Sequence, residues 1–355
     1  MSGEAVRMLA SAAAQPSDVL LVACGDVVFD RGVAKVCKDR GTDWPLAAVT
    51  DTLSSADIAF VNLESPLSNS GARIPGKGIW FRSDPCFGEK LATAGIDVVS
   101  LANNHILDYG ESAFSDTVDV LWANGIAGCG GGADMWEARR PVLLRKNGIT
   151  FAFLGYSEFA EIYWSVTHPV RFLAGVNKPG VAPANAAMVS EDVARAKRIA
   201  DHVVVSFHWG DEYVHMPADR QVSLAHTAID AGASLAIGHH PHVLQPVEVY
   251  HGGIIFYSLG NFVFDQKKPD TVESMMARVA FSRDRVSQAE AVPVRIEECR
   301  PRPLTAWAAR IALWRLSRWS ASRGTDILNL SGRGVIMLPR QAAAAEAQGL
   351  GKLLP

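Results

Sequence analysis

The sequence predicts an α/β protein with a substantially parallel sheet, and two observations lead to this prediction. Short apolar runs rich in Val, Ile, Leu and Phe recur along the chain, and helix-compatible stretches separate several of them. Runs of about three to six residues are too short for helices, but they suit strands that are buried on both faces. Alternation of strands and helices is the pattern of an α/β architecture.

The expected strands and helices follow one another along most of the chain. The expected strands cover residues 19–23, 58–61, 98–101, 149–154, 203–207, 235–237 and 254–257. The expected helices cover residues 112–124, 191–200 and 220–231. Gly125 and Gly232 directly follow the first and the last of these helices, and glycine is a common helix stop.

The chain changes character after Asp270. We expect further strands at 272–281 and 291–296, followed by a helix at 307–319. Large apolar side chains recur in that helix close to helical spacing, namely Trp307, Ile311, Trp314, Leu316 and Trp319. Because amphipathic helices usually bury their apolar stripe, we expect these side chains to pack against the body of the protein.

Composition and charge exclude several classes of protein. Apolar residues make up 48% of the 355 residues and charged residues 20%, which supports a sizeable core. The formal charge is −3, so nucleic acid is not an expected partner. The five cysteines are scattered without a CxxC pair, which argues against a disulfide framework and against a cysteine-rich zinc site.

The sequence predicts no membrane span, because no apolar run reaches the roughly 18 residues that a bilayer requires. Residues 10–14 resemble a signal cleavage site, but the apolar stretch before it is short, and Glu4 lies where a signal peptide is basic. We therefore expect a cytoplasmic protein, with export as the minority alternative.

Polar groups follow six of the expected strands directly. They are Gly25-Asp26, Asn62-Leu63-Glu64, Asn103-Asn104-His105 with Asp108, His208 with Glu212, Gly238-His239-His240-Pro241-His242, and Gly260-Asn261. Sites of parallel α/β sheets gather at the carboxyl ends of the strands, so we expect these groups to meet at one rim.

Their mixture of carboxylate, amide and imidazole groups predicts a divalent metal site. The expected ligands are Asp26, Glu64, Asn104, His208, His240 and His242. Such a set suits one or two ions of Mn, Zn or Fe in an open, catalytic site. In an extended segment His240 and His242 share a face. The rival pair, His239 with His242, requires a turn at 238–241, which Gly238 and Pro241 would permit.

Further residues are candidates for catalysis and substrate binding. If a helix begins at 104–109, Asp108 can orient the His105 imidazole, which would protonate a leaving group. Glu212 is an alternative base or a ligand for a substrate amine. Arg31, Lys77 and Arg82 are cations suited to a carboxylate or a phosphate, although Lys77 could instead be a surface loop charge. The candidate substrate-binding set also includes Asn103, Tyr213 and Asn261.

These motifs resemble the CapA family of capsule and poly-γ-glutamate biosynthesis proteins. The matching segments include Leu101-Ala102-Asn103-Asn104-His105, His208-Trp209-Gly210, Gly238-His239-His240-Pro241-His242-Val243 and Tyr257-Ser258-Leu259-Gly260-Asn261-Phe262. The resemblance runs from about residue 19 to residue 340. It implies one domain at 18–340, with an N-terminal extension at 1–17 and a tail at 341–355.

CapA proteins are in turn similar to calcineurin-like metallophosphoesterases. That similarity implies a four-layer, two-sheet α/β sandwich with mixed sheets, flanking helices and a dinuclear metal centre. It also implies that Asp26 is the first ligand, that Glu64 bridges two ions and that His105 is the catalytic imidazole. Two positions depart from the superfamily pattern: Val28 stands where a histidine is usual, and Glu64 replaces an aspartate.

Two function classes follow. The first is a metal-dependent hydrolase or transferase, in which a metal-activated water and the His105 acid act on an amino-acid-like, γ-glutamyl, peptide or phosphoester substrate. The second is a non-catalytic, accessory component of poly-γ-glutamate or capsule polymer synthesis. A small molecule or a peptide is the expected partner, and the sequence leaves the oligomeric state open.

Overall fold

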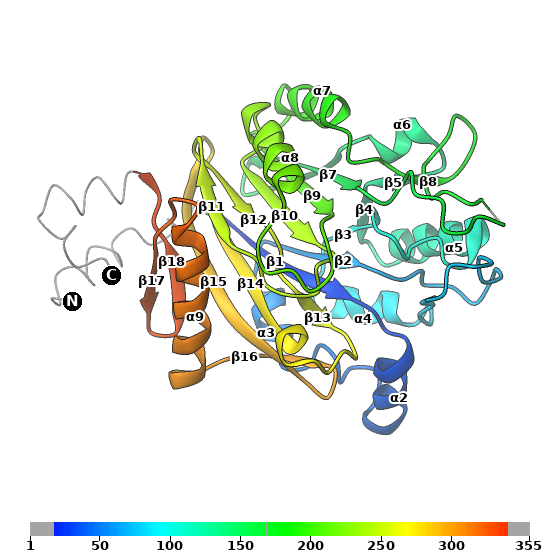
Figure 1. Cartoon of the computed structure of the whole chain (residues 1–355), viewed down its shortest axis with the longest axis horizontal. Coiled ribbons are helices and arrows are strands. Elements are labelled where there is room, and N and C mark those ends of the chain that lie inside the picture. The colour runs from blue at the N-terminus through cyan, green and yellow to red at the C-terminus, as the bar shows by residue number, and fades with distance from the viewer. Residues whose placement is uncertain (1–17, 168, 340–355) are drawn as a thin grey trace, which may run out of the picture.

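The computed structural model describes residues 18–167 and 169–339. Over these residues the chain forms two mixed sheets that pack face to face, with helices on both outer faces (Figure 1). The expected four-layer α/β sandwich is therefore confirmed. The signal-like segment and the expected tail lie outside the described residues, because these exclude 1–17, 168 and 340–355.

The larger sheet carries the N-terminal half of the site. Within the described residues it has ten strands, in the order β17 (Ile327–Leu330), β18 (Arg333–Ile336), β15 (Val286–Glu297), β14 (Glu273–Phe281), β1 (Val19–Val27), β2 (Ile58–Leu63), β3 (Val98–Ser100) and β4 (Ala127–Cys129), with β13 (Asn261–Val263) beside β1 and β16 (Arg300–Pro303) beside β15. The neighbours β1, β2, β3 and β4 run parallel.

The smaller sheet carries the histidines. In the described chain its six strands lie in the order β11 (Val247–Tyr250), β12 (Gly253–Phe256), β10 (Leu235–His239), β9 (His202–His208), β7 (Ile149–Ser157) and β6 (Val142–Lys146). The four inner strands are parallel. A separate short pair joins β5 (Gly131–Gly132) to β8 (Gly180–Val181).

The helices lie on the outer faces of the two sheets. The larger sheet packs against α2 (Arg31–Arg40), α3 (Thr50–Ser54), α4 (Phe87–Thr93) and α5 (Gly110–Ala123). The smaller sheet packs against α7 (Ala186–Lys197) and α8 (Asp219–Asp230), with α6 (Met135–Ala138) nearby in the chain. The turn η1 (Pro269–Val272) precedes β14, and α9 (Ala306–Ala321) packs against β15, β17, β18 and β11.

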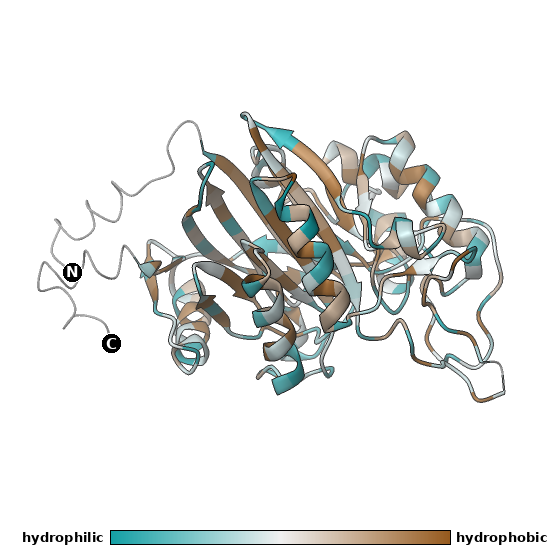
Figure 2. Ribbon diagram, turned by 90° about the horizontal axis from the view of Figure 1, so that it is seen from above, coloured by the Kyte–Doolittle hydropathy of each residue, from teal (hydrophilic) through white to brown (hydrophobic). Residues whose placement is uncertain are grey.

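Alternation along the strands produces three apolar layers. In β1, Leu21 faces the core between the two sheets, whereas Val22 faces the helices on the outside. Val204 and Val205 of β9 divide in the same way between the inner core and the α7–α8 side. Figure 2 shows the result: the interior strands are largely brown, and the helices carry teal bands toward solvent.

The structure confirms the seven strands expected before residue 260, together with the two that follow Asp270. Helix α7 begins at Ala186 rather than at the expected residue 191, because the Asn185 side chain caps it by accepting from the backbone N–H groups of Ala187 and Met188. The condition that a helix begins at 104–109 is not met, because those residues form a turn and α5 begins at Gly110.

The expected packing of the apolar stripe of α9 is confirmed for Leu316, which is buried in the core between the sheets, and for Trp319, which packs against that core. It is wrong for Trp307, Ile311 and Trp314, which are exposed. Trp307 is 69% exposed and Trp314 is 61% exposed. The buried stripe is made of smaller and aliphatic side chains, namely Ala309, Ala312, Leu313, Leu316 and Ser320. These positions recur at three- and four-residue spacing too, and Leu316 belongs to both sets, so the periodicity alone did not decide which side of the helix is buried.

Two glycines permit close backbone contacts next to the candidate site residues. A Cβ atom on Gly25 would lie 1.9 Å from the Gly260 carbonyl oxygen, and one on Gly238 would lie 1.9 Å from the Tyr257 carbonyl oxygen. Both contacts are impossible, so only glycine permits these backbone approaches immediately before Asp26 and His239. Among the described residues, no helix has the length and apolar character that crossing a bilayer requires.

Candidate metal centre

The oxygen-bearing side chains come from the carboxyl ends of parallel strands in the larger sheet. Asp26 of β1 is in register with Asn62 of β2 and with Asn261 of β13. Glu64 directly follows β2, and Asn104 lies in the turn after β3. Parallel pairing therefore brings residues far apart in sequence to one edge, as the sequence predicted.

The imidazoles come from the smaller sheet. His208 ends β9 and is in register with His239, which ends β10. His240 and His242 follow in a turn, with φ angles of 95° and 57°. The extended backbone from which we argued the pairing of these two residues is therefore wrong, because neither residue has strand geometry. Both side chains nevertheless face the carboxylates of the larger sheet.

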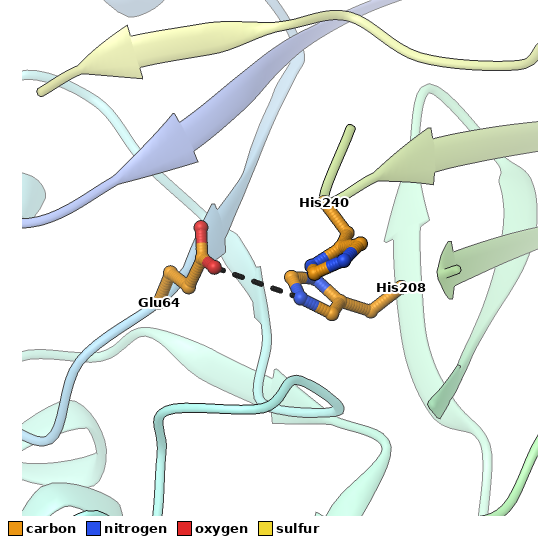
Figure 3. A group of neighbouring side chains, drawn as sticks. All are labelled: Glu64, His208 and His240. Carbon is orange, nitrogen blue, oxygen red and sulfur yellow. Dashed lines mark ion pairs between the residues drawn. The ribbon is translucent and has the colours of Figure 1, made fainter. Parts of the chain in front are cut away.

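The side chains form two overlapping groups that share one carboxylate. Glu64, His208 and His240 form the first group, and Asp26, Glu64 and His242 form the second; in each, the candidate donor atoms lie within 4.8 Å of one another. All five residues are buried. Figure 3 shows Glu64 facing His208 and His240, with Glu64 Oε1 3.6 Å from His208 Nε2.

Several buried polar atoms in these groups lack hydrogen bonds within the described structure. They are both carboxylate oxygens of Glu64 and Nδ1 of His240. A buried carboxylate without a partner is costly, whereas a divalent cation among carboxylates and imidazoles would satisfy it. The donor set thus fits a metal ion, and the His/Glu/Asp clusters are able to bind one.

Asn104 joins the cluster through His208. Its Oδ1 lies 2.9 Å from His208 Nε2. The six side chains expected as ligands therefore converge on one place. His239 does not join either group, although its Nδ1 lies 3.2 Å from Asp26 Oδ1.

Burial and close charges shift the pKa values of the cluster in opposite directions. Burial, followed by the charge of Asp26, raises the pKa of Glu64 well above its usual value. Burial also lowers the pKa of His208 and of His240 far below the usual imidazole value. Burial opposes a charge on His242 as well, but Glu64 and Asp26 outweigh it and raise its pKa to about 9.

Asp26 differs from Glu64 because its oxygens have partners. Burial alone would raise its pKa, but the imidazoles of His239 and His242 hold the pKa of Asp26 well below its usual value. The Asn62 amide also donates to Asp26 Oδ1 at 2.8 Å, and the His240 backbone N–H donates to Oδ2 at 3.3 Å. Asp26 is therefore a fixed anion at the centre of the site.

His105 stands beside the cluster in a polar triad with Asp108 and Lys77. His105 Nδ1 lies 2.6 Å from Asp108 Oδ2 and 3.0 Å from Lys77 Nζ. Lys77 also donates to Asp108 Oδ1 and to the Asn104 carbonyl. The hydrogen bonds that the described structure shows for the His105 ring are made by Nδ1 and not by Nε2.

The triad controls the charge of His105. Burial, followed by the charge of Lys77, lowers the pKa of His105 well below its usual value. Burial raises the pKa of Asp108 to about 7 even though Lys77 opposes that shift. The Lys77 side chain is only 3% exposed, so the structure places this cation inside the site and not on an open surface loop.

Three asparagines hold the cluster in position. The Asn103 amide donates to the Leu63 carbonyl at 2.8 Å, and its Oδ1 accepts from the backbone of His105. Asn261 Oδ1 lies 2.8 Å from His242 Nδ1. Sequence reasoning missed Asn62 as a functional candidate, although its place two residues before Glu64, at the end of a strand, was a usable signal.

The remaining candidates lie at the edge of the site. Arg31 pairs with Asp265 and stacks over Phe81 at 4.5 Å. Arg82 stacks over the Tyr109 ring at 4.2 Å, so its guanidinium points to that ring. Tyr213 is 41% exposed, with its ring 6.3 Å from the His242 ring, and its neighbour Glu212 is exposed.

Val28 occupies the position where the superfamily pattern has a histidine. It is 1% exposed and packs with Phe81 and Phe264 in a small apolar cluster. The ligand that the pattern would supply there is thus replaced by an apolar contact. Phe81 also stacks on His105, with ring centroids 4.0 Å apart.

The fold and the cluster define a two-sheet α/β protein with a buried centre able to bind divalent metal. Residues 20–266 match the family model described as "Bacterial capsule synthesis protein PGA_cap". The chain belongs to this family, as the resemblance to CapA proteins predicted.

Relatives of known name agree with this assignment. The chain is 35% identical over 282 residues to a Bacillus subtilis protein named "PGA biosynthesis protein CapA", and the match covers 79% of this chain and 72% of that protein. It is 32% identical over 311 residues to the "Capsule biosynthesis protein CapA" of Bacillus anthracis, covering 84% and 73%. A relative from Mycobacterium tuberculosis is named "Probable polyglutamine synthesis accessory protein". It is 35% identical to this chain, and the match covers 62% of this chain and 60% of that protein.

A solved structure with a similar chain trace is that of a hypothetical protein from Thermus thermophilus. It has 14% sequence identity and a TM-score of 0.45, and the match covers 78% of this chain and 98% of that one.

Proposed function

We propose that this protein is a metal-dependent hydrolase or transferase of the capsule synthesis family. Its substrate would be a γ-glutamyl or other peptide amide, or a phosphoester. One observation carries the proposal: buried carboxylates and imidazoles form two groups that share the unpartnered Glu64 carboxylate, beside a triad that holds His105 through Nδ1. Buried titratable groups with strongly shifted pKa values cluster at functional sites.

The residues of the two groups would hold one or two divalent ions, of Mn, Zn or Fe. Glu64, His208 and His240 would bind one ion, and Asp26, Glu64 and His242 would bind a second, with Asn104 offering an oxygen to the first. A divalent ion in such a site polarises a substrate oxygen and makes water a better nucleophile near neutral pH. The orientation of the ligands would be held by the hydrogen bonds of Asn62, Asn103 and Asn261.

His105 would move the proton. Its depressed pKa keeps the imidazole neutral near pH 7, so Nε2 would accept a proton from the attacking water and then donate it to the leaving group. In the tautomer with Nδ1 protonated, Asp108 would accept from Nδ1–H and hold the ring, and Lys77 would balance the charge of Asp108. Phe81, stacked on the imidazole, restrains the ring and excludes water from one face.

Cations at the edge of the site suit an anionic substrate. Arg31 lies at the start of α2, and Lys268 stacks over the Tyr213 ring at 3.8 Å. A carboxylate or phosphate group placed over the cluster would meet these charges and the Tyr213 hydroxyl. Glu212, exposed next to Tyr213, is suited to a substrate amine.

The proposal can be tested on the purified full chain. Metal content is measured first, and hydrolysis of γ-glutamyl peptides and of an aryl phosphate is then compared with and without chelator. We expect bound Mn, Zn or Fe, and turnover of one substrate class that chelator abolishes and metal restores. The matched variant His105→Ala should retain metal and lose turnover. A metal-free protein that turns over neither class would contradict the proposal.

An accessory role in polymer synthesis is the second candidate, because one relative carries "accessory" in its name. The two candidates differ in how a cell that depends on the protein would respond to His105→Ala. An enzyme loses polymer with that variant, whereas an accessory protein keeps polymer as long as the fold is intact.

A further inference from the structure

Helix α9 presents a stripe of large apolar and basic side chains to solvent. We call Trp307, Arg310, Ile311, Trp314 and Arg318 the α9 outer face. The three apolar members are 69%, 47% and 61% exposed, in chain order. Positions 307, 311, 314 and 318 recur every three or four residues, so they line one side of the helix over about 16 Å. The stripe is thus a continuous ridge and not a set of scattered exposed side chains.

The opposite side of α9 fixes the helix firmly to the protein. Leu313 and Leu316 belong to the apolar core between the two sheets. The Ser320 hydroxyl accepts from the Val247 backbone N–H at 2.9 Å, which joins the end of the helix to the edge strand β11. Figure 1 shows α9 beside β15 and β18, at the end of the molecule near β17. The α9 outer face therefore belongs to a helix that is fixed to the rest of the protein.

The charge of this helix departs from that of the whole chain. Helix α9 contains three arginines and no acidic residue, although the chain has a net charge of −3. Arg315 pairs with Glu273, but among the described residues neither Arg310 nor Arg318 forms an ion pair. Their guanidinium groups instead lie over Trp307 at 5.9 Å and over Trp314 at 5.4 Å.

We propose that the α9 outer face docks on the surface of a bilayer that contains anionic lipids. Tryptophan is favoured at the level of lipid headgroups because its ring is apolar and its N–H is polar. Arginine beside it can bind lipid phosphates while the indole and Ile311 enter the acyl boundary. A convex ridge with two uncompensated cations fits a flat anionic surface, which needs no matching groove.

Vesicle flotation with the full chain tests this proposal. The vesicles contain either phosphatidylcholine alone or equal parts of phosphatidylcholine and phosphatidylglycerol. We expect binding only to the anionic vesicles, weakened by high salt because exposed charges are then screened. Arg310→Glu with Arg318→Glu should lower the affinity by about 25-fold or more, since each arginine near an anionic surface contributes on the order of fivefold.

Other exposed tryptophans provide a matched control. Trp307→Ala with Trp314→Ala should lower vesicle affinity at least about tenfold, because two large apolar groups no longer leave water. Trp122→Ala with Trp136→Ala removes tryptophans that are 82% and 68% exposed on α5 and α6, and this pair should bind as the parent does.

Three results would overturn the proposal. The first is failure of the parent protein to bind anionic vesicles. The second is equal loss of binding in the two tryptophan pairs. The third is a dimer, measured by sedimentation in the absence of lipid, that Trp307→Ala with Trp314→Ala dissociates while vesicle binding is unchanged; the ridge would then be a contact between two copies of the chain.

Discussion

The two sheets supply different chemistry to the candidate metal centre. The larger sheet supplies oxygens, from Asp26, Glu64 and Asn104, and the smaller sheet supplies imidazoles, from His208, His240 and His242. The difference extends to the backbone. Asp26 lies in a strand and Glu64 directly follows one, whereas His240 and His242 lie in a turn with positive φ angles.

The contrast shows that backbone strain among the candidate metal ligands is confined to the segment of the smaller sheet that carries His240 and His242. Neither sheet alone holds both anions and neutral bases, so metal binding would require the two halves of the sandwich to be packed together. Variants that remove the candidate metal ligands of one sheet should therefore lose metal binding while the protein still folds.

Glu64→Gln should have the largest effect, because Glu64 is the one residue that both donor groups share. Loss of a residue that only orients a ligand typically costs about 10–100-fold in metal affinity, and loss of this shared donor should cost more. In the metal-free protein the variant also removes the Glu64 charge that raises the pKa of His242, so it should shift the pH dependence of thermal unfolding. Metal content and thermal unfolding measure the two effects. A variant that retains metal would show that Glu64 is not a shared metal ligand.

His105→Ala should lower kcat by about 10²–10⁴-fold, the usual contribution of a positioned proton-transfer group. It should leave metal content unchanged, because His105 belongs to neither donor group. Kinetics on the substrate that the screen identifies, together with metal analysis, measure this split. Full kcat in the variant would make Glu212 the better candidate, and loss of metal would reopen the assignment of Asn104.

Two neighbouring histidines at the end of β10 can be compared directly through the variants His240→Ala and His239→Ala. His240 is a member of a donor group, so its removal should release metal. His239 belongs to neither donor group and contacts the ligand Asp26, so His239→Ala should cost no more than about 10–100-fold in metal affinity, as for residues that orient a ligand. Isothermal titration with Mn or Zn compares the two. The reverse order of affinities would show that His239 is the ligand.

Asp108→Asn should be a milder form of His105→Ala. The amide cannot balance Lys77 or fix the imidazole tautomer as the carboxylate does, but the imidazole remains in place. We expect kcat to fall by less than in His105→Ala, with KM nearly unchanged. The pH profile of kcat should also move, which a loss of packing alone would not cause. An unchanged profile with unchanged kcat would remove Asp108 from the mechanism.

Between about pH 6.5 and pH 9, acidity should affect the metal-free and the metal-bound protein in opposite ways. In the metal-free protein the pKa of His242 is raised to about 9. Its charged form therefore stabilises the fold fully below the unfolded pKa of about 6.5, and this contribution is lost as the pH rises through 9. Metal binding needs the neutral imidazole, so affinity should rise over the same range and fall below about pH 6.

Thermal unfolding with and without metal, from about pH 6.5 to pH 9, measures both trends. At lower pH the depressed pKa values of His208 and His240 make acid destabilise the metal-free fold as well. Parallel pH dependence of the two forms, or full metal retention at pH 5, would count against the imidazoles of the smaller sheet as ligands.

The sequence predicted the larger sheet's contribution better than the smaller sheet's. Strand register decides where Asp26 and Glu64 lie, and apolar runs followed by polar groups are visible in sequence. The turn at His240 and His242 depends on left-handed backbone, which the sequence does not specify for histidine. The burial of Lys77 and the exposure of Trp307 and Trp314 depend on tertiary packing, which periodicity does not decide.

A crystal soaked with Mn or Zn tests the central claim most directly, through the anomalous scattering of the bound ions. We predict two anomalous peaks about 3.5–4 Å apart, the usual spacing of two-metal sites, on either side of the Glu64 carboxylate. One peak should lie beside His208 and His240, and the other beside Asp26 and His242. No peak between the two sheets, or a peak only at surface carboxylates, would contradict the account.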